Sequence, residues 1–130
     1  MADIKSTLLY RWFTEVWNNE KAEMIDELML PGTTAHGNLA DEAPSGSEGF
    51  KVFYNGFKSR FKDAAWILST LYRRVIMNHI KAVHIPSGKP VDFYGICMVR
   101  KSEGRIAEAW NNFDFLTMYR QLGQKLGPVS

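Results

Sequence analysis

The chain has 130 residues, 45% of them hydrophobic and 23% charged, with a formal net charge of +2, and these values predict a single globular domain over residues 1–130. The mixed charges exclude a dense basic stripe, and no window approaches 18 apolar residues, so we expect neither a nucleic-acid nor a membrane partner. The lone cysteine, Cys97, excludes an intrachain disulfide and fits a cytoplasmic location.

Aromatic residues make up 13% of the chain, which is the unusual feature of its composition. Aromatic rings bury large areas, and they also line ligand pockets. The composition therefore leaves two interpretations open, a bulky solid core and a partly hollow aromatic cavity.

Two helices and a short strand are predicted before residue 38. Residues 3–19 carry apolar side chains at the 3.6-residue period, which predicts an amphipathic helix. Residues 20–29 predict a shorter second helix that Pro31 and Gly32 stop, and residues 33–37 predict a short strand. The apolar stripe of the first helix consists of Ile4, Leu8, Leu9, Trp12, Phe13, Val16 and Trp17.

A third helix is predicted after a polar loop at residues 38–46. Ser45 and Glu48 have the spacing of a capping box, in which the glutamate reaches back to the amide of the capping residue. Aromatic side chains then follow at intervals of three and four residues, so they share one face of the helix. These side chains are Phe50, Phe53, Tyr54, Phe57 and Phe61.

The second half of the chain predicts four strands. Residues 66–72, 75–85, 91–101 and 105–115 are rich in β-branched and aromatic residues and are separated by turn-forming segments. Because short connections join antiparallel neighbours, we expect successive hairpins, followed by a closing helical turn at residues 115–122. Helices followed by strands predict an α+β domain with its helices on one face of an antiparallel sheet.

Several motifs, in this order and spacing, resemble those of the SnoaL-like polyketide cyclases, which belong to the nuclear transport factor 2-like superfamily. The match to GRIAEAW and the residues that follow it is the strongest. The motifs are EVWN at 15–18, HG at 36–37, GSEGF at 46–50, FKD at 61–63, IPSGK at 85–89, GRIAEAW at 104–110, Asp114 and RQLG at 120–123.

The resemblance implies a cone made of a strongly bent sheet and three helices, a homodimer, and an active site without a cofactor. Members of the family close polyketide rings by an aldol reaction. In them an acidic residue near the end of the last strand is the general acid/base, assisted by a histidine on the preceding strand. Here the first position falls on Asn111 and the second on Cys97. An amide does not exchange protons near neutral pH, and a neutral thiol is a poor substitute for imidazole.

Asp114 and His36 are the other candidates for proton transfer. Asp114 lies between two phenylalanines near the end of the last strand, where partial desolvation would raise its pKa; its alternative role is to cap the final helical turn. His36 lies beside a polar loop near the expected pocket mouth and is either a site residue or a hydrogen-bonding residue of the loop.

His79 and Cys97 are the candidates within the strands. His79 is interpreted either as a polar group that lines the pocket or as an ordinary strand residue, and its strand places it opposite in parity to the nearest other histidine, so we expect no metal site. Cys97 shares a face with Phe93 and Val99, which favours a small buried side chain or a pocket wall over a nucleophile.

An apolar ligand pocket would be lined by aromatic side chains of the helices and of the last strand. The same stripes equally predict an ordinary core. The candidate ligand-binding residues are Trp12, Phe13, Tyr54, Phe57, His79, Cys97, Trp110 and Asn111.

Two classes of function remain open from the sequence. One is a cofactor-free enzyme, cyclase-, isomerase- or hydrolase-like, which acts on a small hydrophobic molecule with Asp114 or His36 as base and Asn111 as a hydrogen-bond donor to an enolate oxygen. The other is a non-catalytic module that binds a small ligand or dimerises. No glycine-rich phosphate loop occurs in the required context, so no nucleotide cofactor is expected.

Overall fold

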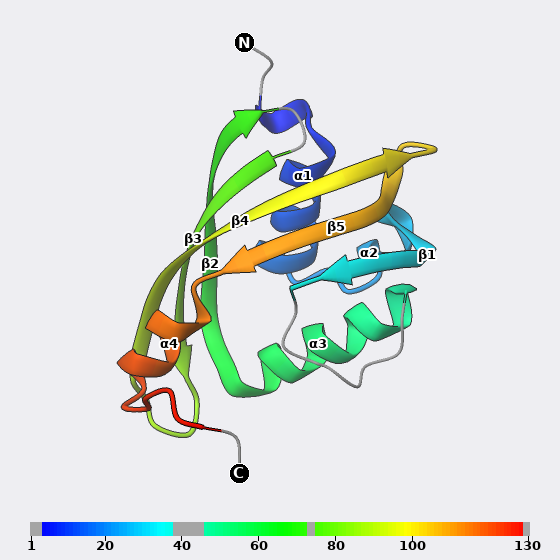
Figure 1. Ribbon diagram of the computed structural model, residues 1–130. Helices are drawn as coiled ribbons and strands as arrows, with labels where there is room; N and C mark the ends of the chain where they lie inside the picture. The colour runs from blue at the N-terminus through cyan, green and yellow to red at the C-terminus, as the bar shows by residue number, and fades with distance from the viewer. Residues whose placement is uncertain (1–3, 38–45, 73–74, 129–130) are drawn as a thin grey trace.

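The computed structural model describes residues 4–37, 46–72 and 75–128, and the chain folds as a curved five-stranded sheet with helices (Figure 1). The elements are η1 (Ile4–Ser6), α1 (Leu8–Arg11), η2 (Trp12–Asn18), α2 (Met24–Leu28), β1 (Met29–His36), α3 (Gly46–Arg60), β2 (Phe61–Tyr72), β3 (Val75–His84), β4 (Pro90–Ser102), β5 (Arg105–Phe113) and α4 (Phe115–Gln121).

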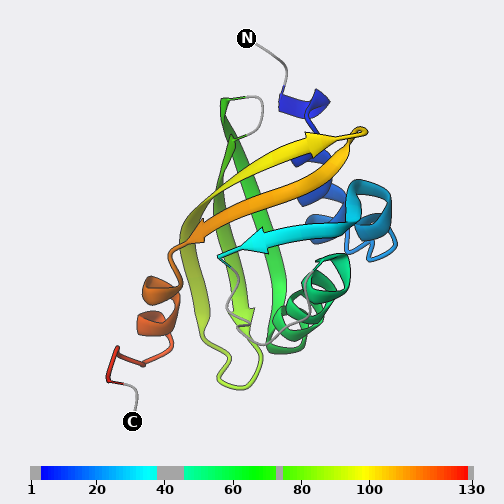
Figure 2. The ribbon, with the colours of Figure 1, turned by 45° about the vertical axis from the view of Figure 1, so that its right-hand side comes forward.

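The sheet has the strand order β1-β5-β4-β3-β2, so the four expected strands form successive antiparallel hairpins as predicted. The first strand is added at the far edge and runs parallel to β5. Figures 1 and 2 show the sheet curving around α1 and η2, with α4 set apart where β5 ends. The α+β class with N-terminal helices on a bent, mostly antiparallel sheet is therefore confirmed, and no helix of the described residues could span a membrane.

The first predicted helix is helical over nearly its whole length but is divided into three segments. Thr7 caps α1, because its side chain accepts a hydrogen bond from the amide of Tyr10 at 3.1 Å. The following segment, η2, has π-helical hydrogen bonding that ends with the Asn19 amide donating to the Thr14 carbonyl. A π-helical turn rotates the apolar stripe relative to an ideal helix, which the 3.6-residue period does not anticipate.

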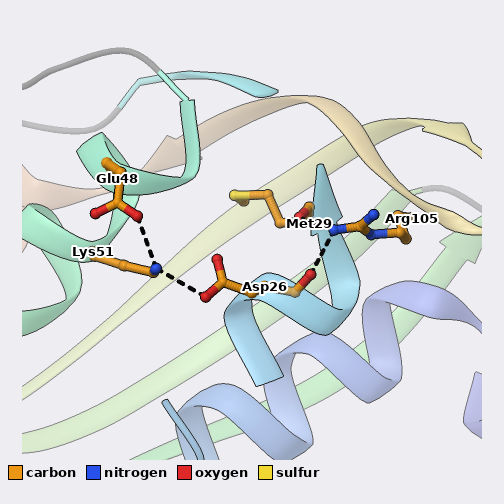
Figure 3. Close-up of polar contacts among 5 residues, drawn as sticks. All are labelled: Asp26, Met29, Glu48, Lys51 and Arg105. Atoms are coloured by element: carbon orange, nitrogen blue, oxygen red, sulfur yellow. Dashed lines mark hydrogen bonds and ion pairs between the residues drawn. The ribbon is translucent and has the colours of Figure 1, made fainter. Parts of the chain in front are cut away.

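The second helix is shorter than predicted, because α2 begins at Met24 instead of at residue 20, while its end at Leu28 lies one residue before the predicted end. The chain is already extended at Pro31 and Gly32. These two residues lie within an irregularity in the pairing of β1 with β5 and do not stop the helix. The helix end is held by Arg105, whose guanidinium donates to the Asp26 carbonyl at 2.6 Å and to the Met29 carbonyl at 3.1 Å (Figure 3). A cation at this point satisfies carbonyl groups that a helix leaves free at its C-terminus.

The third helix is confirmed over Gly46–Arg60, and its expected cap, Ser45, lies outside the described residues, as does most of the preceding loop. Lys51 joins α3 to α2, because its ammonium lies 2.9 Å from the carboxylate of Asp26 and 3.0 Å from that of Glu48 (Figure 3). The helix ends before Phe61, which already pairs with His84 as the first residue of β2. The helical spacing of Phe61 is therefore overridden by strand pairing.

The core between the sheet and the helices is dominated by aromatic rings. Trp17 is at its centre, with the centroids of five other rings 4.7–6.2 Å from its own. Burial of such rings is the largest hydrophobic contribution that a domain of this size obtains per residue. The five rings belong to Phe50, Phe53, Tyr54, Phe57 and Trp66.

Candidate functional site

The inner face of the sheet brings together Cys97 and Asn111, the two positions to which the resemblance assigned the expected proton-transfer residues. Cys97 on β4 and Asn111 on β5 are direct register partners. Cys97 is buried while its neighbours Ile96 and Met98 are exposed, so its side chain points towards the helices. Burial raises the pKa of the Cys97 thiol to about 12, so the thiol stays protonated at neutral pH. The Asn111 amide nitrogen donates to the backbone carbonyl of His36 at 3.1 Å.

Four of the predicted ligand-binding rings, Trp12, Phe13, Tyr54 and Phe57, lie inside the domain, and each is at most 8% exposed. The Tyr54 hydroxyl donates to the Val16 carbonyl at 2.9 Å, so its polar atom is already used to join α3 to η2. Phe13 stacks on the Trp66 ring with centroids 5.3 Å apart, and Phe57 stacks on the Phe61 ring with centroids 4.7 Å apart. These rings are core residues, and only Phe57 among them also reaches the wall of a described cavity.

That cavity opens between α3 and α4 and has a volume of about 320 Å³. Its wall is mainly apolar, with one cation, Arg60, at its edge. A volume of this size is at the lower end of those that hold small molecules in proteins. The lining residues are Val52, Phe53, Gly56, Phe57, Arg60, Phe61, Phe115, Met118 and Tyr119.

His36 and Trp110 lie on the outer face of the sheet, away from Cys97. The His36 ring stacks on Trp110 with centroids 5.6 Å apart, and its Nε2 lies 2.9 Å from the Glu108 carboxylate. The hydrogen bond from His36, assisted by Arg100, holds the pKa of Glu108 below its usual value. The structure therefore joins His36 to a carboxylate, but it does not bring His36 together with the buried aromatic rings.

His79 also faces outward. Its strand neighbours Asn78 and Ile80 are fully buried, whereas His79 is partly exposed, hydrogen-bonds Asp92 and stacks on Tyr94 at 4.3 Å. This position follows from the alternation of side chains along β3. The structure places His79 apart from the inner-face residues with which the sequence analysis grouped it.

Asp114 caps α4, as the structural interpretation of this residue predicted. Its carboxylate accepts hydrogen bonds from the Thr117 amide at 3.0 Å and from the Thr117 hydroxyl at 2.6 Å. These bonds hold the pKa of Asp114 below its usual value, opposite to the direction expected from desolvation between Phe113 and Phe115. A carboxylate with a lowered pKa is a weaker base at neutral pH.

No group of three histidine, cysteine, aspartate or glutamate side chains that could hold a metal ion is found among the described residues. Within the same residues, the buried polar side chains are Thr33, Ser47 and Asn78, and none of them is charged. The buried residues of the described chain therefore offer hydrogen bonds and apolar contacts and are uncharged, although two single atoms of charged side chains, Glu15 Oε2 and Arg105 Nε, are also buried.

Asn78 is the inner-face residue that the sequence analysis missed. Its side chain is fully buried, and neither its amide oxygen nor its amide nitrogen has a hydrogen-bond partner among the described residues. The signal was present in the sequence, because Asn78 stands between Ile76 and Ile80 on the apolar face of a predicted strand. Asparagine is a residue that strand interiors disfavour.

Comparison with known proteins places this geometry in a family. The family model for SnoaL-like polyketide cyclases matches residues 7–122. No curated protein matches the chain.

Three solved structures show the same fold at low sequence identity. A candidate polyketide cyclase from Acidithiobacillus ferrooxidans is 21% identical, with a TM-score of 0.79 over 97% of this chain and 99% of that one. IdmH, a candidate polyketide cyclase from Streptomyces antibioticus, is 24% identical, with a TM-score of 0.74 over 90% and 96%. A hypothetical protein with a ketosteroid isomerase-like fold from Catenulispora acidiphila, solved with trimethylamine, is 11% identical, with a TM-score of 0.75 over 95% and 98%.

Proposed function

Since the chain belongs to the SnoaL-like polyketide cyclase family, we propose that it binds a small hydrophobic molecule between its curved sheet and its helices without catalysing the family's proton transfer. The observation that carries the proposal is the chemistry at the two register partners Cys97 and Asn111. One is a thiol with a pKa of about 12 and the other is an amide, so neither exchanges a proton at neutral pH.

The surroundings of these two residues support binding. The described inner face is built from aromatic rings, aliphatic side chains and uncharged polar groups, which is the composition of a site for a neutral apolar ligand. The cavity between α3 and α4 supplies an apolar entrance of about 320 Å³ on the same side of the sheet as the helices.

A cofactor-free cyclase, isomerase or hydrolase is the second candidate, and one observation favours it. His36 and Glu108 form a hydrogen-bonded pair, 2.9 Å between Nε2 and Oε2, of the kind that positions a histidine as a general base. Asp114 is the other proposed base, although its carboxylate is engaged by Thr117. For either group to act, the substrate would have to bind at the outer face or at the end of β5.

The two functions are separated by following a ligand and its fate. The protein as purified is examined by native mass spectrometry for a bound small molecule, which is then extracted and identified. The wild-type chain and the variant His36→Ala are incubated with that molecule and its products are measured; if none is found, they are incubated with 2-acetylnaphthalene in deuterated water, and the deuterium taken up at its methyl group is measured as turnover. Saturable binding with no turnover by either chain supports the binding proposal. Turnover by the wild type that His36→Ala abolishes contradicts it and supports the enzyme.

We also propose that the chain forms a homodimer through the outer face of its sheet. Large apolar side chains are exposed there on β2, β4 and β5, each between 37% and 54% exposed. Next to those on β4 lies a hollow of about 450 Å³ lined in part by Met77 and Leu116. Exposed apolar patches of this kind are typical of interfaces. The exposed residues are Ile67, Tyr94, Ile96, Met98 and Trp110.

The dimer is tested by light scattering coupled to gel filtration. The wild type is expected to elute as a dimer and Ile96→Glu as a monomer, since a buried unpaired carboxylate is unfavourable at an interface. Val52→Glu, at an exposed apolar residue of α3, is the matched control and should remain dimeric. A monomeric wild type would contradict the proposal.

The reduced thiol of Cys97 agrees with the cytoplasmic location that we infer for the protein.

A further inference from the structure

We propose that Asn78 is the residue that recognises the ligand, by hydrogen bonding to a carbonyl or hydroxyl oxygen on an otherwise apolar molecule. The inference rests on the proposed binding function and adds to it the ligand's polar group and the residue that selects it. Asn78 lies at the middle of β3, paired with Leu68 on β2 and with Gly95 on β4, so it lies near the centre of the inner face.

The unpaired amide of Asn78 is energetically unfavourable in the free protein. Asn78 is 0% exposed, and its Nδ2 and Oδ1 both lack a partner among the described residues. Burial of an amide without hydrogen bonds is unfavourable, and an apolar side chain of similar volume would remove that penalty. The strand position itself favours β-branched residues such as the flanking Ile76 and Ile80. An asparagine here therefore lowers the stability of the free protein and needs a partner that the described chain does not supply.

A second unpaired donor lies on the neighbouring strand. The indole Nε1 of Trp66 is buried and has no hydrogen-bond partner among the described residues. Trp66 stands on the same face of β2 as Leu68, the residue that pairs with Asn78. The inner face thus carries an indole N–H and an amide in adjacent strands, and both can donate to an oxygen atom.

The space beside Asn78 is occupied by a ring that belongs to another residue. Gly95 has no side chain, and the Phe113 ring lies over it so closely that a Cβ on Gly95 would be 1.9 Å from Phe113 Cδ1. Phe113 is only partly buried, and its ring meets Trp66 edge-on at 5.7 Å. Displacing this ring gives a flat apolar ligand access to the Asn78 amide.

A continuous row of rings connects this position with the cavity between α3 and α4. The ring centroids of Phe113 and Phe115 are 5.8 Å apart, and those of Trp66 and Phe57 are 6.2 Å apart. Phe115 and Phe57 both line the cavity. Two successive rings therefore lie on each route from the cavity towards Asn78, and their contacts with each other can be exchanged for contacts with the ligand.

The chemistry of the site defines the class of ligand. None of the buried residues described is charged, and Arg60 lines the cavity between α3 and α4, so an ionised carboxylate or phosphate placed at Asn78 would be left without a counter-charge. The oxygen of a neutral aromatic ketone can accept from Asn78 Nδ2 or from the indole N–H, and a phenol hydroxyl can also donate to Asn78 Oδ1, while the rings of either molecule replace the contacts of Phe113. The inference is thus for an uncharged, flat molecule with an oxygen at its edge.

The test compares two probes of nearly the same shape, 2-acetylnaphthalene and 2-ethylnaphthalene, which differ in one carbonyl oxygen. Binding of each to the full chain is measured by quenching of tryptophan fluorescence. The wild type is expected to bind the ketone more tightly than the hydrocarbon. In the variant Asn78→Leu the ratio of the two dissociation constants should fall by about 3- to 10-fold, which is the equivalent of one hydrogen bond. Asn55→Leu, at an exposed asparagine of α3, is the matched control and should keep it.

A thermal unfolding measurement on the same variants guards against misfolding. Asn78→Leu should unfold at or above the wild-type temperature, because it removes an unpaired buried amide; a lower temperature would mean that the free protein already satisfies this amide, which contradicts the inference. If both probes bind but Asn78→Leu keeps the ketone preference, the inference fails and the binding function stands. If neither probe binds to any variant, the binding function fails, and the inference fails with it.

Discussion

Replacement of Gly95 by alanine is expected to destabilise the protein, and the structure fixes the reason. A Cβ at Gly95 would lie 1.9 Å from Cδ1 and 2.5 Å from Cε1 of the Phe113 ring. Carbon atoms in contact prefer separations of about 3.5–4.0 Å, so the ring or the strand must move by more than an ångström. In the free protein, moving the ring would cost its contacts with the rings of Trp66 and Phe115, whose centroids lie 5.7 Å and 5.8 Å from its own.

The magnitude follows from two opposing effects. Overpacking of this kind typically costs about 1–3 kcal/mol. Replacement of glycine by alanine also reduces the entropy of the unfolded chain, which stabilises by about 0.4–1 kcal/mol. The expected loss in the free energy of unfolding for Gly95→Ala is therefore about 1–2 kcal/mol.

Urea unfolding of four variants measures this effect. Gly95→Ala should lower the midpoint without changing the slope, whereas the control Gly56→Ala, at a helix position with no atom within 4 Å, should raise the stability by about 0.5–1 kcal/mol. In a Phe113→Ala background, Gly95→Ala should become neutral or stabilising, because the ring that it meets is gone. Equal destabilisation in both backgrounds would refute the contact between Gly95 and Phe113.

Three further changes test other parts of the structure. Arg105→Met should lower the free energy of unfolding by about 1–3 kcal/mol, because two carbonyls at the end of α2 lose a charged donor; the exposed Arg100→Met should change it by less than about 0.5 kcal/mol in the same urea titration. Cys97 should not react with a thiol reagent at pH 8 until the protein unfolds, and reaction at the rate of a free thiol would show that Cys97 is accessible. Because folding raises the pKa of the thiol, its contribution to the free energy of unfolding should be complete below the usual thiol pKa and decline as pH rises towards 12. Asp114→Ala should lower the thermal midpoint at pH 7, and Asp114→Asn, which still caps α4, should lower it less. Because the hydrogen bonds from Thr117 lower the pKa of Asp114, the difference in thermal midpoint between the wild type and Asp114→Ala should shrink as pH falls through that pKa. A difference that does not depend on pH would contradict the cap.

Periodicity along the chain was enough to predict most of the fold. The alternation of buried and exposed residues on β4 places Cys97 on the inner face, as expected from its sharing a face with Phe93 and Val99. The hairpin order and the closing α4 follow from short turns and from the cap at Asp114. These features are local, so the residues that determine them are neighbours in the sequence.

The features that were not predicted depend on contacts between distant segments. The parallel pairing of β1 with β5 and the start of β2 at Phe61 are decided by the partner strand and not by the segment itself. The outward direction of His36 is fixed by Glu108 and Trp110, which are more than 70 residues away in the chain. Asn78 was overlooked because an amide on an apolar strand face becomes significant only when the structure shows that nothing pairs with it.

The central claim is that the space between the sheet and the helices receives a neutral apolar ligand whose oxygen is recognised by Asn78. A crystal structure of the chain with bound 2-acetylnaphthalene tests this directly. We expect the naphthalene rings to lie among Phe57, Trp66 and Phe113, with the carbonyl oxygen within hydrogen-bond distance of the Asn78 amide nitrogen. A probe bound instead on the outer face beside Tyr94, with Phe113 still covering Gly95, would contradict the claim.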